Sequence, residues 1–206
     1  MGFEMQTIDF ITSNEQKIEW ANEIAIEYGY AIKFRAHPYD FDEMRSIKAD
    51  EIAARKVEQG MAIGDRPFIV EDSGFYIDAL NGFPATFVKF GLSTIGVSGI
   101  VKLMKDVEDK YRTYYIKSAI GYGNPSKKLT NVVISSSGGI LSHDYVAGDE
   151  RGWGEIMGII IPKNYSTPVT RFSNDEWIRY KHDIKEGDAF SISLGKTLKI
   201  ISEDMG

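Results

Sequence analysis

The sequence contains no cysteine among its 206 residues. This absence excludes disulfide bonds, catalysis by a thiolate and zinc sites built from cysteine, and it is compatible with a reducing cytosol. Histidine is also scarce, with three in the chain. His37 and His143 have no metal-ligand partner at a useful spacing, and an isolated His182 is more often a surface or packing residue than a ligand. A metal centre based on histidine or cysteine is therefore not expected.

Long apolar runs and an excess of basic residues are also absent. No run approaches the ~20 residues of a membrane-spanning helix, and the first six residues lack the charged-then-apolar form of a signal peptide. The 30 acidic and 24 basic residues give a net charge of −6. This balance argues against a nonspecific nucleic-acid coat, but it permits a local basic pocket for a small phosphorylated ligand. We expect a soluble, cytoplasmic protein with no nucleic-acid or membrane partner.

Several common motifs are missing as well. There is no Walker sequence, and the glycines of 121–123 and 152–154 match the dinucleotide-binding fingerprint only in part. A nicotinamide-binding Rossmann domain is therefore not expected. No repeat, low-complexity tract or linker divides the chain, so its length indicates one domain, or one large domain with a smaller lobe.

Hydrophobic periodicity gives the expected elements. Apolar residues at helical spacing predict helices over 17–27, 47–59 and 95–105. Runs rich in β-forming residues predict strands over 7–12, 31–36, 67–70, 75–80, 112–121 and 129–136. Helices and strands alternate early and strands dominate later, which indicates a mixed α/β domain.

Glycines are expected to interrupt these elements. Ser73-Gly74 is predicted to turn the chain, and Ser137-Gly138-Gly139 is predicted to break the strand that begins near residue 129. Gly195 argues against a long terminal helix over 190–202, because glycine is a poor helix former.

The most informative segment joins an apolar run to two acids. Phe68 to Val70 ends on Glu71 and Asp72, and paired acids at the end of a buried strand are costly unless a metal or a cation meets them. Carboxylate oxygens are hard ligands that suit Mg²⁺. The alternative is that two solvated acids open a turn, which would be the better interpretation if the segment stood alone.

A second motif lies between the first strand and the first helix. It runs Thr12-Ser13-Asn14-Glu15-Gln16-Lys17. A helix N-terminus offers free N–H groups and a positive dipole end, which together favour an anion, and Lys17 adds a charge one turn further on. The alternative is an ordinary N-cap followed by a surface lysine.

Together these motifs resemble the Ham1-type inosine triphosphate pyrophosphatase family, most closely its archaeal members. The resemblance rests on residues 12–17, on Glu43, on Lys56, and on the block from Glu71-Asp72-Ser73-Gly74 to Asn81-Gly82-Phe83-Pro84. It continues through residues 85–90, 94–96, 99–103 and 115–122. The Glu-Asp-Ser-Gly block with its downstream Asn-Gly-Phe-Pro is specific, whereas the N-terminal motif alone is not.

The resemblance implies an elongated α/β fold with a central mixed sheet, flanking helices, and a single domain of two lobes around a nucleotide cleft. Family members are often homodimers. They hydrolyse noncanonical purine nucleoside triphosphates, such as those of inosine and xanthosine, to the monophosphate and pyrophosphate with Mg²⁺. By resemblance, we expect a homodimeric nucleoside triphosphate pyrophosphatase.

The resemblance also implies residue roles. Asp72 matches the catalytic carboxylate that holds the metal or activates water, Glu43 matches the other metal-side acid, and Glu71 is a further candidate metal ligand. The triphosphate-binding positions correspond to Thr12, Ser13, Asn14, Lys17 and Lys56, with the hydroxyl of Ser73 beside them. Outside the family pattern, Lys56 would be interpreted as a solvated helical lysine and Glu43 as a surface acid.

The last third of the chain departs from the family pattern. The segment from Arg151 to Pro162 keeps the glycines, an aromatic residue and the proline of the family loop, but it lacks the aspartate. Trp153 is a candidate to stack on the base, and a buried packing tryptophan is an equal alternative.

The family's Ser-His-Arg motif is also missing. Alignment on Ala189-Phe190 places Ile184-Lys185-Glu186 at that position, and a shifted register offers Lys181 and His182 instead. Lys181 and Lys185 are therefore the candidate base-side residues. Two alternatives stay open beside the main hypothesis. One is the same reaction with altered or broader base specificity, and the other is a nucleotide-binding protein with little turnover.

Overall fold

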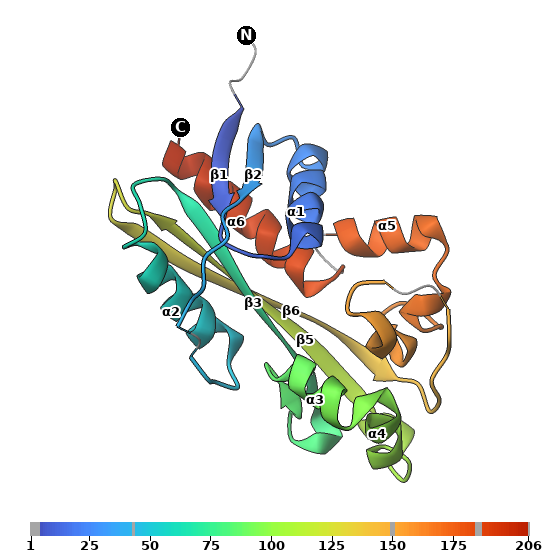
Figure 1. The fold of residues 1–206 in the computed structure, drawn as a ribbon. Coiled ribbons are helices and arrows are strands. Elements are labelled where there is room, and N and C mark those ends of the chain that lie inside the picture. The colour runs from blue at the N-terminus through green and yellow to red at the C-terminus, as the bar shows by residue number, and fades with distance from the viewer. Residues whose placement is uncertain (1–4, 43, 149–150, 184–186, 206) are drawn as a thin grey trace. The chain divides into compact units, whose positions relative to one another are not determined.

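A computed structural model of the chain describes residues 5–42, 44–148, 151–183 and 187–205. Seven strands form one sheet in the order β2-β1-β3-β5-β6-β7, and β4 pairs with β3 (Figure 1). The strands are β1 (Gln6–Phe10), β2 (Ile32–Ala36), β3 (Phe68–Ile77), β4 (Pro84–Ala85), β5 (Thr113–Asn124), β6 (Leu129–Leu141) and β7 (Ile160–Pro162).

Both strand directions occur in this sheet. β1 pairs in parallel with β2 and with β3, whereas β4 is antiparallel to β3 and β7 is antiparallel to β6. The predicted mixed α/β sheet with flanking helices is therefore confirmed.

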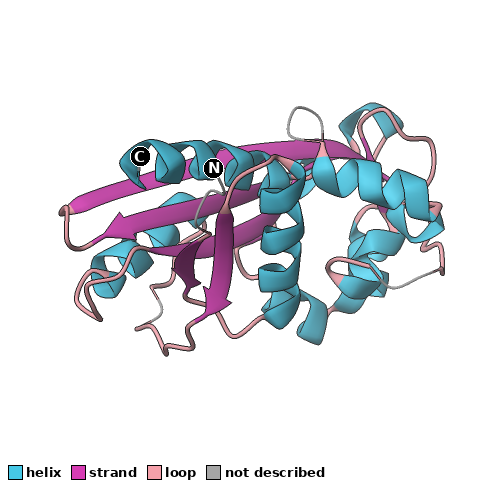
Figure 2. Cartoon of the chain, turned by 90° about the horizontal axis from the view of Figure 1, so that it is seen from above, coloured by secondary structure: helices cyan, strands magenta, loops and turns pink. Residues whose placement is uncertain are grey.

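Helices of very different length accompany the sheet (Figure 2). The α-helices are α1 (Glu15–Glu27), α2 (Ala49–Gly60), α3 (Val88–Thr94), α4 (Gly96–Leu103), α5 (Asn174–His182) and α6 (Ala189–Met205). Short 3-10 helices cover Asp78–Leu80, Asp109–Tyr111, Gly154–Gly158 and Val169–Arg171. None of the helices in the described part of the chain combines the length and the apolar character needed to cross a membrane.

The chain divides into two compact units. The first contains Met1–Ser73, Ser118–Ser135 and Ala189–Gly206, and the second contains Gly74–Lys117 and Ser136–Asp188. Each unit therefore joins segments that are far apart in the sequence. The nucleotide cleft expected between two lobes stays a prediction.

In the first unit, helices cover both faces of the sheet. On one face, Ile69 of β3 shares a core with Ile18 of α1 and Leu194 of α6. On the other face, Val70 of β3 packs with Val57 of α2. Because successive side chains of a strand point to opposite faces, α1 and α6 lie on one side of β3 and α2 lies on the other (Figure 1).

The predicted interruption of the C-terminal segment at Gly195 is wrong, since α6 runs unbroken from Ala189 to Met205. Glycine costs ~1 kcal/mol in a helix interior relative to alanine. Leu194, Leu198 and Ile201 of the same helix are fully buried, and burying each contributes ~1.5–3 kcal/mol. Packing of this apolar face therefore outweighs the low helix propensity of one residue.

The predicted breaks at Ser73-Gly74 and at Ser137-Gly138-Gly139 are also wrong, because β3 and β6 pass through these positions as continuous strands. The glycines serve close packing instead. A Cβ on Gly74 would lie 2.7 Å from the Tyr76 ring, and one on Gly139 would lie 2.0 Å from the main-chain oxygen of Ile161 in β7. The absence of a side chain at Gly139 thus permits β7 to approach β6.

Candidate active site

The loop between β1 and α1 forms a capped helix start, as predicted. The side chain of Asn14 accepts a hydrogen bond from the main-chain N–H of Lys17 at 3.2 Å, and Thr12 Oγ1 accepts one from the N–H of Asn14 at 3.1 Å. Ser13 and Asn14 are exposed, and Thr12 is partly buried. The first turn of α1 therefore presents its positive dipole end at an accessible surface.

Lys17 reaches from this helix start to Glu71 on β3. The Lys17 ammonium donates to Oε2 of Glu71, while Oε1 accepts from the hydroxyls of Ser73 and, at 3.0 Å, Ser118. The Glu71 side chain is 2% exposed. Burial raises the pKa of Glu71, but the charge of Lys17 and the hydrogen bonds from Lys17 and Ser73 outweigh it, so that the net shift is downward. Glu71 therefore stays ionised inside the protein.

Lys56 of α2 forms the second ion pair. Its ammonium lies 2.7 Å from Oδ1 of Asp72 and also donates to the main-chain oxygen of Glu71 at 3.2 Å. The Asp72 side chain is 19% exposed. Burial raises the pKa of Asp72 more than the nearby Lys56 lowers it, and the charge of Glu71 adds to the rise. Asp72 is therefore a stronger proton acceptor than an ordinary aspartate.

The two acids face opposite sides of the sheet because they are neighbours on one strand. Glu71 lies with Ile69 on the side of α1 and α6, and Asp72 lies with Val70 on the side of α2. Each acid pairs with a lysine ammonium, as expected because burial of an unpaired carboxylate costs several kcal/mol of solvation free energy. The interpretation of two solvated acids that open a turn is wrong.

Gly121 of β5 permits the close approach of α2 that brings Lys56 to Asp72. A Cβ at this position would lie 2.2 Å from Cγ2 of Val57 and 2.8 Å from Cγ2 of Val70. Val57 follows Lys56 directly in α2. The spacing between α2 and the sheet therefore depends on the missing side chain.

Asp72 offers one carboxylate oxygen to a hard divalent cation. Oδ1 of Asp72 is engaged by Lys56, and no partner for Oδ2 is found among the described residues. Mg²⁺ in nucleotide sites usually takes one or two carboxylates together with phosphate oxygens and waters. The described part of the chain holds no ready-made cluster of three or more acids or histidines for a metal. Glu43, the other predicted metal-side acid, lies outside the described residues.

The remaining predicted residues lie elsewhere. Trp153 precedes the short helix Gly154–Gly158 and Lys181 belongs to α5, both within the second unit, and Lys185 lies outside the described residues. The sequence reasoning missed Trp177, whose ring has the cations of Arg151 and Lys181 at 5.7 and 5.8 Å from its centre. The spacing of four residues between Trp177 and Lys181 on a helix is the feature that would have indicated this contact.

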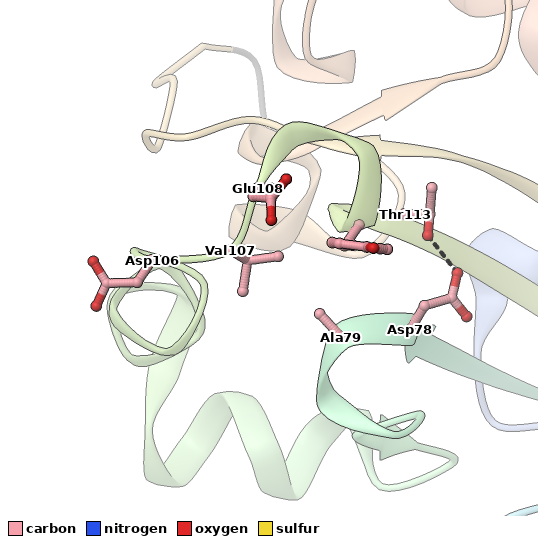
Figure 3. A pocket seen from close by; sticks show the side chains of 7 residues that line it. Asp78, Ala79, Asp106, Val107, Glu108 and Thr113 are labelled. Atoms are coloured by element: carbon pink, nitrogen blue, oxygen red, sulfur yellow. Dashed lines mark hydrogen bonds between the residues drawn. The ribbon is translucent and has the colours of Figure 1, made fainter.

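A pocket of about 420 Å³ lies in the second unit (Figure 3). Asp78, Asp106 and Glu108 line it, and Thr113 donates a hydrogen bond to Asp78 at 2.5 Å. No basic side chain lines this pocket in the described part of the chain. Its negative lining opposes a triphosphate, so it is not the candidate nucleotide site.

We predict that Gly121→Ala lowers the free energy of unfolding by ~1–3 kcal/mol, because the new methyl group overpacks the contact between α2 and the sheet. Chemical denaturation of the variant and the wild type measures this difference. Gly64→Ala is the matched control, since a Cβ at Gly64 has no atom within 4 Å. Equal stability of the two variants would show that α2 does not depend on Gly121.

Comparison with known proteins identifies the family of this chain. The sequence model of the Ham1 family matches residues 8–183. The dITP/XTP pyrophosphatase of Hyperthermus butylicus is 31% identical over 179 residues, which cover 87% of this chain and 90% of that protein. The dITP/XTP pyrophosphatase of Methanopyrus kandleri is 30% identical over 182 residues, which cover 88% of this chain and 93% of that protein.

Solved structures give the same fold. The HAM1 protein from Coxiella burnetii has a TM-score of 0.76 at 15% sequence identity, covering 97% of this chain and 100% of that chain. The Ham1 protein of Staphylococcus aureus has a TM-score of 0.74 at 15% identity, with coverage of 97% and 100%. The expected resemblance is confirmed by the family match, which spans most of the chain and includes both lysine–carboxylate pairs, and the chain belongs to the Ham1 family.

Proposed function

We propose that this protein hydrolyses noncanonical purine nucleoside triphosphates, such as those of inosine, deoxyinosine and xanthosine, to the monophosphate and pyrophosphate. The observation that carries the proposal is the pairing of Lys17 and Lys56 with the adjacent acids Glu71 and Asp72. Family membership and the names of the relatives, dITP/XTP pyrophosphatases, support the substrate class. Removal of such nucleotides from the cellular pool is the expected role.

The lysines bind the triphosphate in this proposal. Lys17 lies in the first turn of α1, whose positive dipole end near Thr12, Ser13 and Asn14 also favours an anion. Lys56 exchanges the carboxylate of Asp72 for phosphate oxygens when substrate enters. Each lysine acts as a point charge, so its contribution does not depend on the base.

Asp72 is the proposed catalytic residue. It accepts a proton from a water molecule whose oxygen forms a bond to the α-phosphorus, while the bond from that phosphorus to the α–β bridging oxygen breaks. Pyrophosphate leaves with the bridging oxygen. Oδ2 of Asp72, which has no partner among the described residues, is the proposed proton acceptor. Ser73 is proposed to assist through its hydroxyl.

Mg²⁺ is the proposed cofactor, and Asp72 with Glu43 would hold it. When bound, it neutralises phosphate charge and polarises the attacking water. A homodimer and a cytoplasmic location are proposed from the family resemblance alone, and size-exclusion chromatography with light scattering tests the first of these.

Altered base specificity is the second candidate function. The observation that favours it is the replacement of the family's Ser-His-Arg motif by Ile184-Lys185-Glu186, a segment that lies outside the described residues. Trp153 and Lys181 are the other proposed base-side residues. A protein that binds nucleotides without turnover would retain the lysines but release no pyrophosphate.

We predict that inosine triphosphate yields inosine monophosphate and pyrophosphate, and that a chelator of divalent metals abolishes the reaction. The reason is that Lys56 is paired with Asp72 and the charge of Lys17 also acts on Asp72, so that both lysines are proposed to contact the phosphate end of one ligand. Product analysis by anion-exchange chromatography tests this. Release of orthophosphate with a nucleoside diphosphate would show that a different bond is cleaved.

We predict that Asp72→Asn lowers kcat by ~10²-fold or more, the scale of removing a catalytic acid or base. The substitution is nearly isosteric, so circular dichroism should show a folded protein. Asp65→Asn, at an exposed aspartate, is the control and should retain activity. Full turnover in folded Asp72→Asn would remove this residue from the catalytic machinery.

We predict that the protein discriminates between inosine and adenosine triphosphates less strongly than relatives that carry the Ser-His-Arg motif. An unmatched polar group costs ~1–3 kcal/mol, which is about a tenfold change in preference or more. The measurement is kcat/KM for both nucleotides, in the wild type and in Lys185→His with Glu186→Arg. Strong rejection of adenosine triphosphate that the double substitution leaves unchanged would place base recognition elsewhere.

A further inference from the structure

We propose that Glu71 is a positioning residue that holds the ammonium of Lys17 in place for a phosphate group, and that it is not a metal ligand. The inference rests on the proposed function, because it concerns the phosphate end of the same site. It assigns different tasks to two adjacent acids that the sequence alone treats as one metal-binding pair.

Both oxygens of the Glu71 carboxylate are already engaged, which leaves little room for a metal. One oxygen accepts from Lys17, and the other accepts from the hydroxyls of Ser73 and Ser118. With 2% of its side chain exposed, Glu71 offers no room for the several waters that Mg²⁺ keeps in nucleotide sites. A hydrated ion would have to displace Lys17 and enter the protein interior.

Strand geometry separates Glu71 from the residue that does fit a metal. Side chains alternate along β3, so Glu71 faces α1 and α6 while Asp72 faces α2. The two acids also differ in exposure, since 19% of the Asp72 side chain is accessible against 2% of the Glu71 side chain. Asp72 stays a proposed metal ligand, whereas Glu71 does not.

The partners of Glu71 belong to the rigid framework of the first unit. Ser118 lies on β5, and its main-chain oxygen accepts a hydrogen bond at 2.7 Å from the hydroxyl of Ser193 on α6. Ser118 and Ser193 are buried. The carboxylate is therefore fixed from two strands and, through Ser118, from α6.

Lys17 is the exposed member of this arrangement. Its side chain is 29% exposed, so its ammonium lies within reach of a ligand while its charge is held against a fixed acid. A lysine that is ordered before the ligand arrives loses less side-chain freedom on binding, and the affinity rises accordingly. Removal of the acid would leave Lys17 charged but free to adopt many rotamers.

The test uses Glu71→Gln, which keeps the shape of the side chain and removes its charge. Two equilibrium measurements are made on the full chain: binding of inosine triphosphate without metal, by calorimetry, and binding of Mn²⁺ without nucleotide, by electron paramagnetic resonance. We expect nucleotide affinity to fall about tenfold, equivalent to ~1.4 kcal/mol, and Mn²⁺ affinity to stay within twofold. With turnover, KM should rise more than kcat falls. Asp72→Asn should give the opposite pattern, with weaker Mn²⁺ binding.

A double-mutant cycle decides whether Glu71 acts through Lys17. Lys17→Met should weaken nucleotide binding, and adding Glu71→Gln should weaken it no further. Additive losses would overturn the proposal, and so would a tenfold loss of Mn²⁺ affinity in Glu71→Gln or unchanged nucleotide affinity in that variant.

Ser118→Ala provides a second test that keeps all charges, in case Glu71→Gln does not fold. It removes one hydrogen bond to Glu71, and we expect a smaller loss of nucleotide affinity, about threefold, with Mn²⁺ binding unchanged. Weaker Mn²⁺ binding in Ser118→Ala would contradict the proposal. Because these measurements read binding, absence of pyrophosphate release by the wild type would refute the proposed function without deciding the role of Glu71.

Discussion

Two successive carboxylates inside β3 impose the central constraint on the first unit. An ionised acid that leaves water loses several kcal/mol of solvation, which only a close cation and further hydrogen bonds offset. Helix α1 supplies Lys17 on one face of the strand and α2 supplies Lys56 on the other. Both helices must therefore pack against β3 at the correct position, because otherwise the buried acids would have no cation beside them. The fold and the candidate site depend on the same contacts.

This constraint determines the charges of the candidate site in the absence of a ligand. Each lysine is paired with an acid, so neither ammonium group is an isolated positive charge. At Lys56 the ion pair is partly exposed, and in the proposed function phosphate replaces Asp72 as the partner of the lysine. At Lys17 the acid is enclosed, and the pair can persist while the ammonium also contacts the ligand. The two ion pairs thus differ in the exposure of their acids, and the different responses to substrate that we propose follow from this difference.

Local patterns in the sequence predicted the parts of the fold that local interactions determine. The cap at Asn14, the helices α1 and α2, and the mixed sheet followed from periodicity and capping residues. The breaks predicted at Gly74, Gly139 and Gly195 were wrong, because the structural effect of a glycine depends on its tertiary neighbours, which a local sequence pattern does not contain. The pairing of Lys17 with Glu71, 54 residues apart, was likewise beyond reach. The candidate residues came from the family resemblance, and the separate roles that we propose for Glu71 and Asp72 required knowledge of the two faces of β3.

The position of α6 has a consequence for synthesis of the chain. Leu194 and Leu198 share a core with Ile18 and Ile24 of α1, and Ser193 of α6 holds the strand that carries Ser118. A growing polypeptide therefore exposes the apolar face of α1 until α6 has left the ribosome. Domains that close only with their last segment spend longer with uncovered hydrophobic surface, where aggregation competes with folding. Loss of even a few turns of α6 would then leave part of the apolar face of α1 uncovered.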